Sequence, residues 1–153
     1  MALQVKIKPL SPLLGSEIPY PRYATPGSAG LDLAACIERE IVIKPGERAK
    51  VPTGLAIQMP DAGVVGLVFP RSGNAWKYGV SLTNCVGVID SDYIGEIQVI
   101  LQNLDNEQPF VVKRGDRIAQ LVFVPVFQAE LTVVEELSET QRGTGGFGST
   151  GTI

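Results

Sequence analysis

The chain consists of short strand-like runs and turns, and no helical period of useful length is found in it. Turns rich in proline and glycine, two residues that suit the backbone angles of tight turns, stand at 25–28, 44–46, 60–63 and 113–115. The hydrophobic runs of the chain are short, and they are either apolar or alternate between apolar and polar residues, which favours β-strands. We predict strands at 4–8, 31–35, 40–43, 48–52, 55–59, 64–69, 80–83, 96–103, 117–124 and 129–134. Only 72–78 suits a short helix.

Strands at this spacing predict one all-β domain, a jelly-roll-like β-barrel or sandwich. The chain has 153 residues, enough for one domain that buries about two thirds of its unfolded surface. Its last stretch, 142–153, is rich in glycine and poor in apolar side chains. We therefore expect a β domain over 1–141 and a mobile arm over 142–153. Simple disorder of a glycine-rich terminus is the alternative reading of that arm.

The composition excludes several classes of function. The chain has no histidine, and its two cysteines, Cys36 and Cys85, are far apart and form no Cys-x-x-Cys, so neither a disulfide framework nor a structural zinc site is expected. A net charge of −3 and a pI near 5.0 argue against a nucleic-acid partner. No apolar run approaches the roughly 20 residues of a membrane span, and MALQVKIKPL lacks the apolar core of a signal peptide. We expect no membrane partner and a cytoplasmic protein.

The segment 87–96, GVIDSDYIGE, carries two aspartates and an aromatic ring. Apolar residues lead into it and alternate on the way out, which predicts a β-hairpin with Asp90, Asp92 and Tyr93 at its tip. Polar residues at a turn tip often mean only solvation. Because the chain has no histidine, however, proton transfer near neutral pH falls to a carboxylate, a lysine or a tyrosine. If the chain is an enzyme, an aspartate is the candidate base.

Several other segments have the composition of phosphate contacts. The arm joins Arg142, one aromatic residue, Phe147, and hydroxyls to glycines. Glycine backbones can converge on an anion, arginine offers a planar donor fork, and an aromatic ring can stack on a base. The arm therefore suits a flexible lid over a nucleotide. The turn 70–73, PRSG, also combines arginine, hydroxyl and glycine, although a plain strand-to-helix turn capped by Ser72 explains it equally well.

Two further segments are less informative by themselves. The polar residues of 115–120, GDRIAQ, lie at the entry to a predicted strand and suit a solvated strand end. Asp32 lies within the apolar strand 31–35. A buried aspartate needs a hydrogen-bonded turn or a cation as its partner.

Together, five segments closely resemble the motifs of the homotrimeric dUTP diphosphatases (deoxyuridine 5′-triphosphate nucleotidohydrolases). They read AGLDLAA at 29–35, PRSG at 70–73, GVIDSDYIGE at 87–96, RGDRIAQ at 114–120 and RGTGGFGSTG at 142–151. One such motif alone is weak evidence. Five in this order and spacing, over nearly the whole chain, are highly specific.

The resemblance implies a β jelly roll assembled as a homotrimer with active sites shared between subunits. It also implies Mg²⁺-assisted hydrolysis of dUTP to dUMP and pyrophosphate, which limits uracil in DNA and supplies dUMP for dTMP synthesis. In that reaction Asp90 is the general base that activates the water attacking the α-phosphorus. Mg²⁺ sits mainly on the triphosphate oxygens, and Asp32 is an outer-shell carboxylate that holds its waters.

The resemblance also implies the substrate contacts. Uracil is read by the Asn84 side chain and by backbone near Val88, Ile89 and Gln98, and Tyr93 presses on the deoxyribose and excludes a 2′-hydroxyl. The residues expected at the phosphates are Arg71, Ser72, Gly73 and Gln120. The residues expected to close over the nucleotide from the arm are Arg142, Phe147, Gly148, Ser149 and Thr150, with Phe147 stacking on the uracil.

Two alternatives remain at this stage. A dCTP deaminase shares the jelly roll, although the five motifs with a glycine-rich arm favour the diphosphatase. A β-sandwich that only binds other proteins is the non-enzymatic alternative. Pyrophosphate release from dUTP, compared with dCTP, separates all three.

Overall fold

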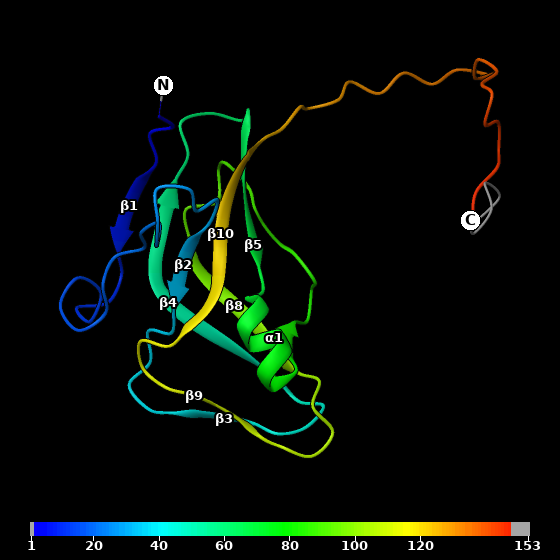
Figure 1. Cartoon of the computed structure of the whole chain (residues 1–153). Helices are drawn as coiled ribbons and strands as arrows, with labels where there is room; N and C mark the ends of the chain where they lie inside the picture. Colours follow the sequence, from blue (N-terminus) through cyan, green and yellow to red (C-terminus); the bar gives the residue numbers. More distant parts are fainter. Residues whose placement is uncertain (1, 148–153) are drawn as a thin grey trace.

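The computed structural model describes residues 2–147, and its regular secondary structure is β-strand except for one short helix (Figure 1). The elements, in chain order, are β1 (Lys6–Pro9), β2 (Leu31–Ala34), β3 (Ile41–Ile43), β4 (Arg48–Gln58), β5 (Val64–Phe69), α1 (Ser72–Tyr78), β6 (Val80–Leu82), β7 (Gly87–Ile89), β8 (Glu96–Asn103), β9 (Phe110–Val112) and β10 (Arg117–Pro125). The short helix stands where the sequence predicts it. Strand β9 was not predicted.

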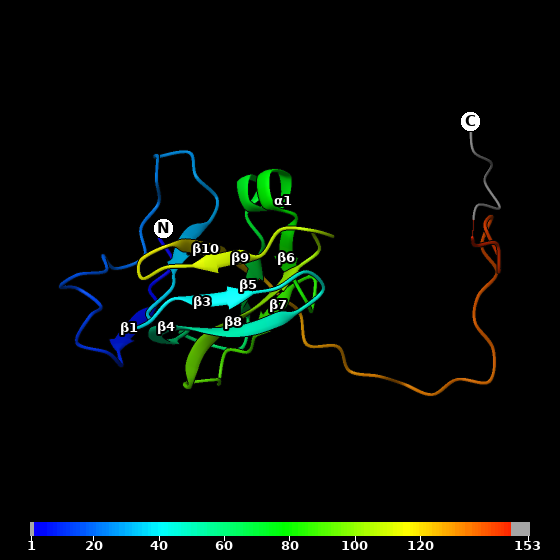
Figure 2. The same cartoon turned by 90° about the horizontal axis from the view of Figure 1, so that it is seen from below.

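The strands form two four-stranded sheets and one two-stranded ribbon. Their orders are β1-β4-β8-β6, β2-β10-β5-β7 and β3-β9, and every pairing between these strands is antiparallel. Figure 1 shows the ribbon at the lower end of the body, below α1, and Figure 2, seen from below, shows it in front of the two sheets. This confirms the predicted all-β, jelly-roll-like fold.

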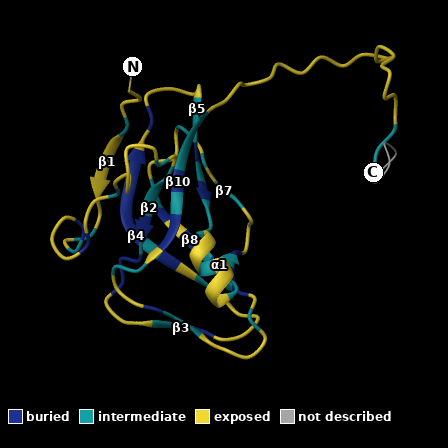
Figure 3. Ribbon diagram, in the orientation of Figure 1, coloured by how far each residue is buried: buried dark blue, intermediate teal, exposed yellow. Residues whose placement is uncertain are grey.

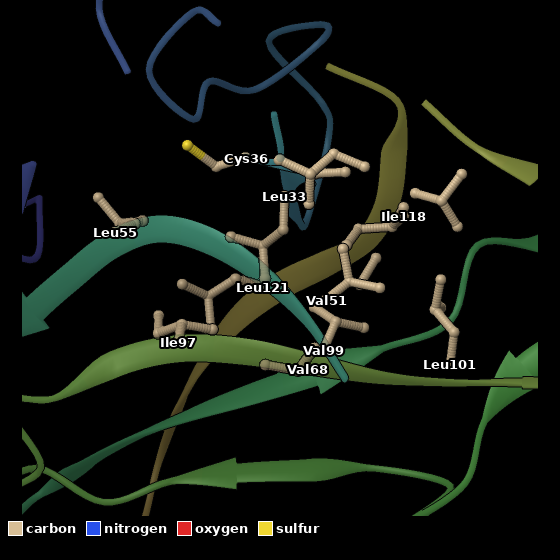
Figure 4. Close-up of a cluster of buried hydrophobic side chains, with 14 of the residues drawn as sticks. Leu33, Cys36, Val51, Leu55, Val68, Ile97, Val99, Leu101, Ile118 and Leu121 are labelled. Carbon is tan, nitrogen blue, oxygen red and sulfur yellow. The ribbon is translucent and has the colours of Figure 1, made fainter. Parts of the chain in front are cut away.

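The core lies between the two sheets, which are packed face to face (Figures 3 and 4). Along β8, buried positions alternate with more exposed ones, so that Ile97, Val99 and Leu101 point inward. They meet Leu33 of β2 and Leu121 of β10, both almost completely buried. This alternation is what a half-buried strand requires, and it fixes which face of each strand is left for a site.

Strand β4 joins two predicted strands, 48–52 and 55–59, into one. The two halves are separated by a bulge: Pro52 faces Gln98 and Ala56 faces Glu96, so three residues of β4 lie opposite one residue of β8. Gly54, inside the bulge, has a φ of +66°. A Cβ there would lie 2.7 Å from the Cys36 sulfur, so both the angle and the space require glycine.

The predicted hairpin over 87–96 is wrong. β7 pairs with β5, in register Gly66 to Ile89, whereas β8 pairs with β4 and β6 in the other sheet. Residues 90–95 therefore cross from one sheet to the other. The alternation of apolar residues marks each strand correctly, but it does not determine which strand will be its neighbour.

The predicted strand at 129–134 is also wrong. The last strand ends at Pro125, and the chain then runs away from the body (Figure 1). Phe127, Leu131 and Val133 are each at least 90% exposed. Alternation alone does not form a strand, because a strand must pair with a neighbour, and residues 129–134 pair with no strand of the described chain.

Within residues 2–147, no helix is long and apolar enough to cross a membrane.

Candidate active site

A surface cavity of about 380 Å³ lies where β2, β10 and the chain after β5 meet. Five of the predicted site residues line it, namely Asp32, Arg71, Ser72, Gly73 and Gln120. The strand register explains their meeting, because Gln120 of β10 faces Asp32 on one side and Phe69 on the other. Three segments distant in the sequence are thus neighbours across one sheet.

Asp32 is the centre of the charge arrangement in this cavity. Its Oδ1 accepts a hydrogen bond from Nε of Arg71 at 3.1 Å, and its Oδ2 accepts one from Nη1 of Arg117 at 3.0 Å. The Asp32 side chain is 24% exposed, and it has the cationic partner that a largely buried carboxylate needs. Two guanidinium groups share one carboxylate, so the cluster keeps an excess positive charge. Such a cavity favours an anionic ligand.

Arg117 is the site residue that the sequence analysis missed. In a regular strand, Arg117 and Gln120 would point to opposite faces because they are three positions apart. A register shift between Arg117 and Ala119 turns both toward the cavity, as a β-bulge does. The sequence points to Arg117 only indirectly. Asp32 needs a cationic partner, and Arg117 is the first residue of β10, the strand that pairs with β2.

The turn 70–73 connects β5 to α1. Its backbone is extended at Arg71, and Gln120 holds it by a hydrogen bond. Arg71 is the N-cap residue of α1, with φ −98° and ψ 128°, and no side chain caps the helix. The alternative that Ser72 caps α1 is therefore wrong, and its hydroxyl lies exposed beside the cavity. Nε2 of Gln120 donates to the carbonyl of Pro70 at 3.0 Å, which ties the turn to β10.

Gly30 leaves the room that Gln120 occupies. A Cβ at position 30 would lie 3.1 Å from Oε1 of Gln120 and 3.3 Å from its Cβ. Because those contacts are tighter than ordinary packing, a side chain at position 30 would push Gln120 away from the turn.

The cavity fits a metal ion that arrives with its ligand better than one caged by the protein. Among residues 2–147 no group of three or more histidine, cysteine, aspartate or glutamate side chains could hold a metal. Asp32 is the only carboxylate among the residues that line the cavity. Mg²⁺ usually keeps several waters and binds through one or two carboxylates together with substrate phosphates. The donor set, with one carboxylate, is compatible with Mg²⁺ that arrives bound to a phosphate ligand.

The residues predicted to read the base lie around β7 and the start of β8. β7 is the last strand of its sheet, so one edge of its backbone is unpaired within that sheet, and Val88 is 62% exposed. Asn84 lies in the turn before β7 and is also exposed. The Tyr93 hydroxyl donates to the carbonyl of Glu96 at 2.9 Å, and Nε2 of Gln98 donates to the Glu96 carboxylate at 2.9 Å.

Asp90 is not brought to the phosphate cavity of its own chain. It follows Ile89, which faces Gly66 near the start of β5, whereas Arg71 comes five residues after Gly66. At about 3.3 Å per residue, the two backbones are on the order of 15–20 Å apart. The candidate base and the cavity therefore occupy opposite ends of β5.

The arm also lies far from the cavity (Figure 1). Nε of Arg142 donates to the carbonyl of Gly145 at 2.9 Å, so its guanidinium is used inside the arm, and the Phe147 side chain is fully exposed. The remaining predicted arm residues, Gly148, Ser149 and Thr150, lie outside the described part of the chain.

Comparison with known proteins identifies the fold and the family. Residues 16–151 match the family model of dUTPase. The chain is 54% identical over 151 residues to deoxyuridine 5′-triphosphate nucleotidohydrolase of Pseudomonas entomophila, covering 99% of this chain and 98% of the relative. It is 61% identical over 131 residues to the same enzyme of Desulfitobacterium hafniense, covering 86% of each.

Solved structures give the same answer. A mutant dUTPase of Staphylococcus bacteriophage 80alpha, solved with dUpNHpp, superposes with a TM-score of 0.81 at 30% identity, covering 97% of this chain and 99% of the phage chain. A mutant dUTPase of phage phi11 of S. aureus, described for its structural Mg(II) ion, gives a TM-score of 0.76 at 25% identity, covering 89% of this chain and 99% of that one. With the fold, the motifs and the relatives in agreement, this chain belongs to the dUTPase family.

Proposed function

We propose that this chain hydrolyses dUTP to dUMP and pyrophosphate, and so limits the uracil available for incorporation into DNA while supplying dUMP for dTMP synthesis. The observation that supports this most directly is the Asp32–Arg71–Arg117 cluster. It offers an excess positive charge in a cavity of about 380 Å³ that also presents a hydroxyl and a side-chain amide. These are the donors that a polyphosphate chain needs.

In the proposed reaction the substrate is dUTP with its Mg²⁺. Arg71, Ser72 and Gly73 bind the phosphate oxygens, Gln120 adds a neutral contact, and Asp32 holds the outer waters of the ion. When bound, Mg²⁺ neutralises part of the phosphate charge. Asp90 takes the proton from the water that attacks the α-phosphorus, a role that is typically worth about 10²–10⁴ in rate.

The uracil base of the nucleotide is recognised by the free backbone edge of β7. Uracil presents two carbonyl acceptors with an N–H donor between them, a pattern that strand backbone near Val88 and Ile89, with the Asn84 side chain, can match. Cytosine carries an amino group where uracil has its 4-oxo group, and would leave buried polar groups unpaired. Mismatches of that kind reach about 10⁴–10⁵ in discrimination.

We propose further that the working unit is a homotrimer whose active sites are shared between subunits. Asp90 and Arg71 occupy opposite ends of β5, so an intact site needs Asp90 from another copy. The tail after Pro125 supports assembly as well, because it exposes large apolar side chains, Phe127, Leu131 and Val133 among them, that an isolated chain leaves in water. We propose that the arm of a neighbouring subunit closes over the site. In that arm Arg142 binds phosphate and Phe147 stacks on the base, together with Gly148, Ser149 and Thr150.

We also propose a cytoplasmic setting, in keeping with the two free cysteines, Cys36 and Cys85.

Pyrophosphate release from a nucleotide panel tests the proposed function. We expect release from dUTP, little from dCTP or UTP, and a strong dependence on Mg²⁺. Ammonia release from dCTP would instead identify a deaminase. A protein that acts on none of these nucleotides would favour an interaction module.

Tyr93→Ala is expected to raise activity on UTP relative to dUTP, because it removes the ring that lies against C2′ of the sugar. The UTP/dUTP ratio of kcat/KM should rise about tenfold or more, the scale of discrimination available from shape in a pocket. Tyr93→Phe keeps the ring and should keep the ratio. A ratio unchanged in Tyr93→Ala would place sugar selection elsewhere.

A further inference from the structure

Glu96 connects three parts of the molecule that are separate in the sequence. Its Oε1 accepts a hydrogen bond from the backbone N–H of Gly54, in the β4 bulge, at 2.9 Å. Its Oε2 accepts one from Nε2 of Gln98 at 2.9 Å. Its backbone carbonyl accepts the Tyr93 hydroxyl at 2.9 Å. One residue therefore contacts the bulge and two of the residues expected at the nucleotide.

The bulge makes this connection rigid. Gly54 is buried, and because it lies inside the bulge its N–H is available to the carboxylate, while its carbonyl accepts from the N–H of Leu10 at 2.8 Å. Its neighbour Thr53, 2% exposed, donates to the carbonyl of Ile97 at 2.6 Å. A hydrogen bond to the charged Glu96 carboxylate is stronger than one between two neutral groups. The Glu96 carboxylate is thereby fixed by the β4 bulge.

The ring of Tyr93 is fixed by the same segment. A Cβ at Gly95 would lie 2.6 Å from both Cζ and the hydroxyl oxygen of Tyr93, so the missing side chain at position 95 is the space that the ring fills. The hydroxyl at the end of the ring donates its hydrogen bond to the Glu96 carbonyl. The positions of Tyr93 and Gln98 both depend on where the Glu96 backbone and side chain are held.

We infer that Glu96 is a positioning residue: its carboxylate, held by the bulge, sets the geometry of the base subsite through Gln98, while its backbone carbonyl receives the Tyr93 hydroxyl. This inference rests on the proposed function, since it assumes that those two residues contact the nucleotide. Glu96 itself touches no reacting atom. Its loss should therefore weaken substrate binding more than it slows the chemical step.

The test compares Glu96→Ala with Thr53→Val. Glu96→Ala should raise the KM for dUTP about tenfold or more, the loss expected when hydrogen bonds to a charged acceptor are removed, with kcat changed less than about threefold. Thr53→Val removes the neighbouring bond of the same bulge without touching Gln98 or Tyr93. It should lower the Tm and leave KM within about twofold. Glu96→Gln keeps an acceptor for the Gly54 N–H, and the Gln98 amide can turn to meet it, so KM should return to within about threefold of wild type.

A double-mutant cycle sharpens the test. In a Gln98→Ala background, Glu96→Ala should raise KM by less than about threefold, because coupled residues are not additive. If Glu96→Ala fails to fold, Glu96→Met keeps the aliphatic stem and removes only the acceptors. An unchanged KM in a folded variant, an equal KM rise in Thr53→Val, or full additivity with Gln98→Ala would overturn the inference. A wild-type protein that releases no pyrophosphate from dUTP would overturn the proposed function instead.

Discussion

Asp90→Asn should lower the turnover of dUTP by about 10² or more while nucleotide affinity stays within about tenfold. Asparagine keeps the size of the side chain and its hydrogen-bonding reach, but it cannot take a proton from water. The side chain is exposed at the end of β7, so the fold should not respond. Single-turnover pyrophosphate release measures the chemical step, and titration with a non-hydrolysable dUTP analogue measures affinity.

Asp92→Asn is the matched control, because it removes the same charge two residues away on the same exposed loop. Its turnover should stay within about threefold of wild type, since it leaves the candidate base in place. A similar loss in both variants would point to the local charge rather than to a base at position 90. Near-normal turnover in Asp90→Asn would remove that residue from its proposed role.

Truncation after Gln141 should leave a folded, trimeric protein that has lost most of its turnover. The last strand ends at Pro125, so the deletion touches no element of the barrel. If the arm only tethers subunits, truncation should instead weaken the trimer, and the trimers that remain should keep their turnover. Circular dichroism, light scattering and pyrophosphate release separate these outcomes. Phe147→Ala in the full chain tests stacking by itself.

Mixing two inactive chains tests whether sites are shared. The truncated chain keeps Asp90, and the full-length Asp90→Asn chain keeps the arm. If base and arm come from different subunits around a three-fold axis, random co-refolding at equal amounts should restore about a quarter of the sites. That fraction is one half for an intact base multiplied by one half for an intact arm.

If base and arm belong to the same chain, every site keeps one defect and mixing restores nothing. Absence of recovery, in trimers confirmed by light scattering, would contradict the shared-site proposal and leave hydrolysis of dUTP unaffected.

The sequence predicted most strands correctly because each strand carries its own evidence, a short alternating run closed by a turn. It could not predict pairing, which depends on distant residues. The sequence therefore predicts a hairpin of β7 and β8, although the two strands belong to different sheets. The run at 129–134 has the alternation of a strand but pairs with no strand in the described part of the chain. β9, three residues long, is too short to give a periodic signal.

In the candidate site, too, local motifs could be predicted from the sequence, but the arrangement of distant residues could not. Local motifs pointed to Asp32, Arg71 and Gln120, and the register of β2, β10 and β5 brings them to one cavity. Arg117 was missed because its direction depends on a bulge that no local pattern reveals. The distance between Asp90 and that cavity was equally invisible, because it is a property of the pairing of β7 with β5.

The short length of β7 has a consequence for solubility. An open strand edge with exposed apolar side chains is a template for edge-to-edge aggregation. β7 has three residues and spans about 10 Å, close to the width of one nucleoside and too short to hold a foreign strand firmly. Asp90 and Asp92 follow it directly, and their charges oppose the approach of another chain. The edge can thus remain open to a small ligand without making the protein prone to self-association.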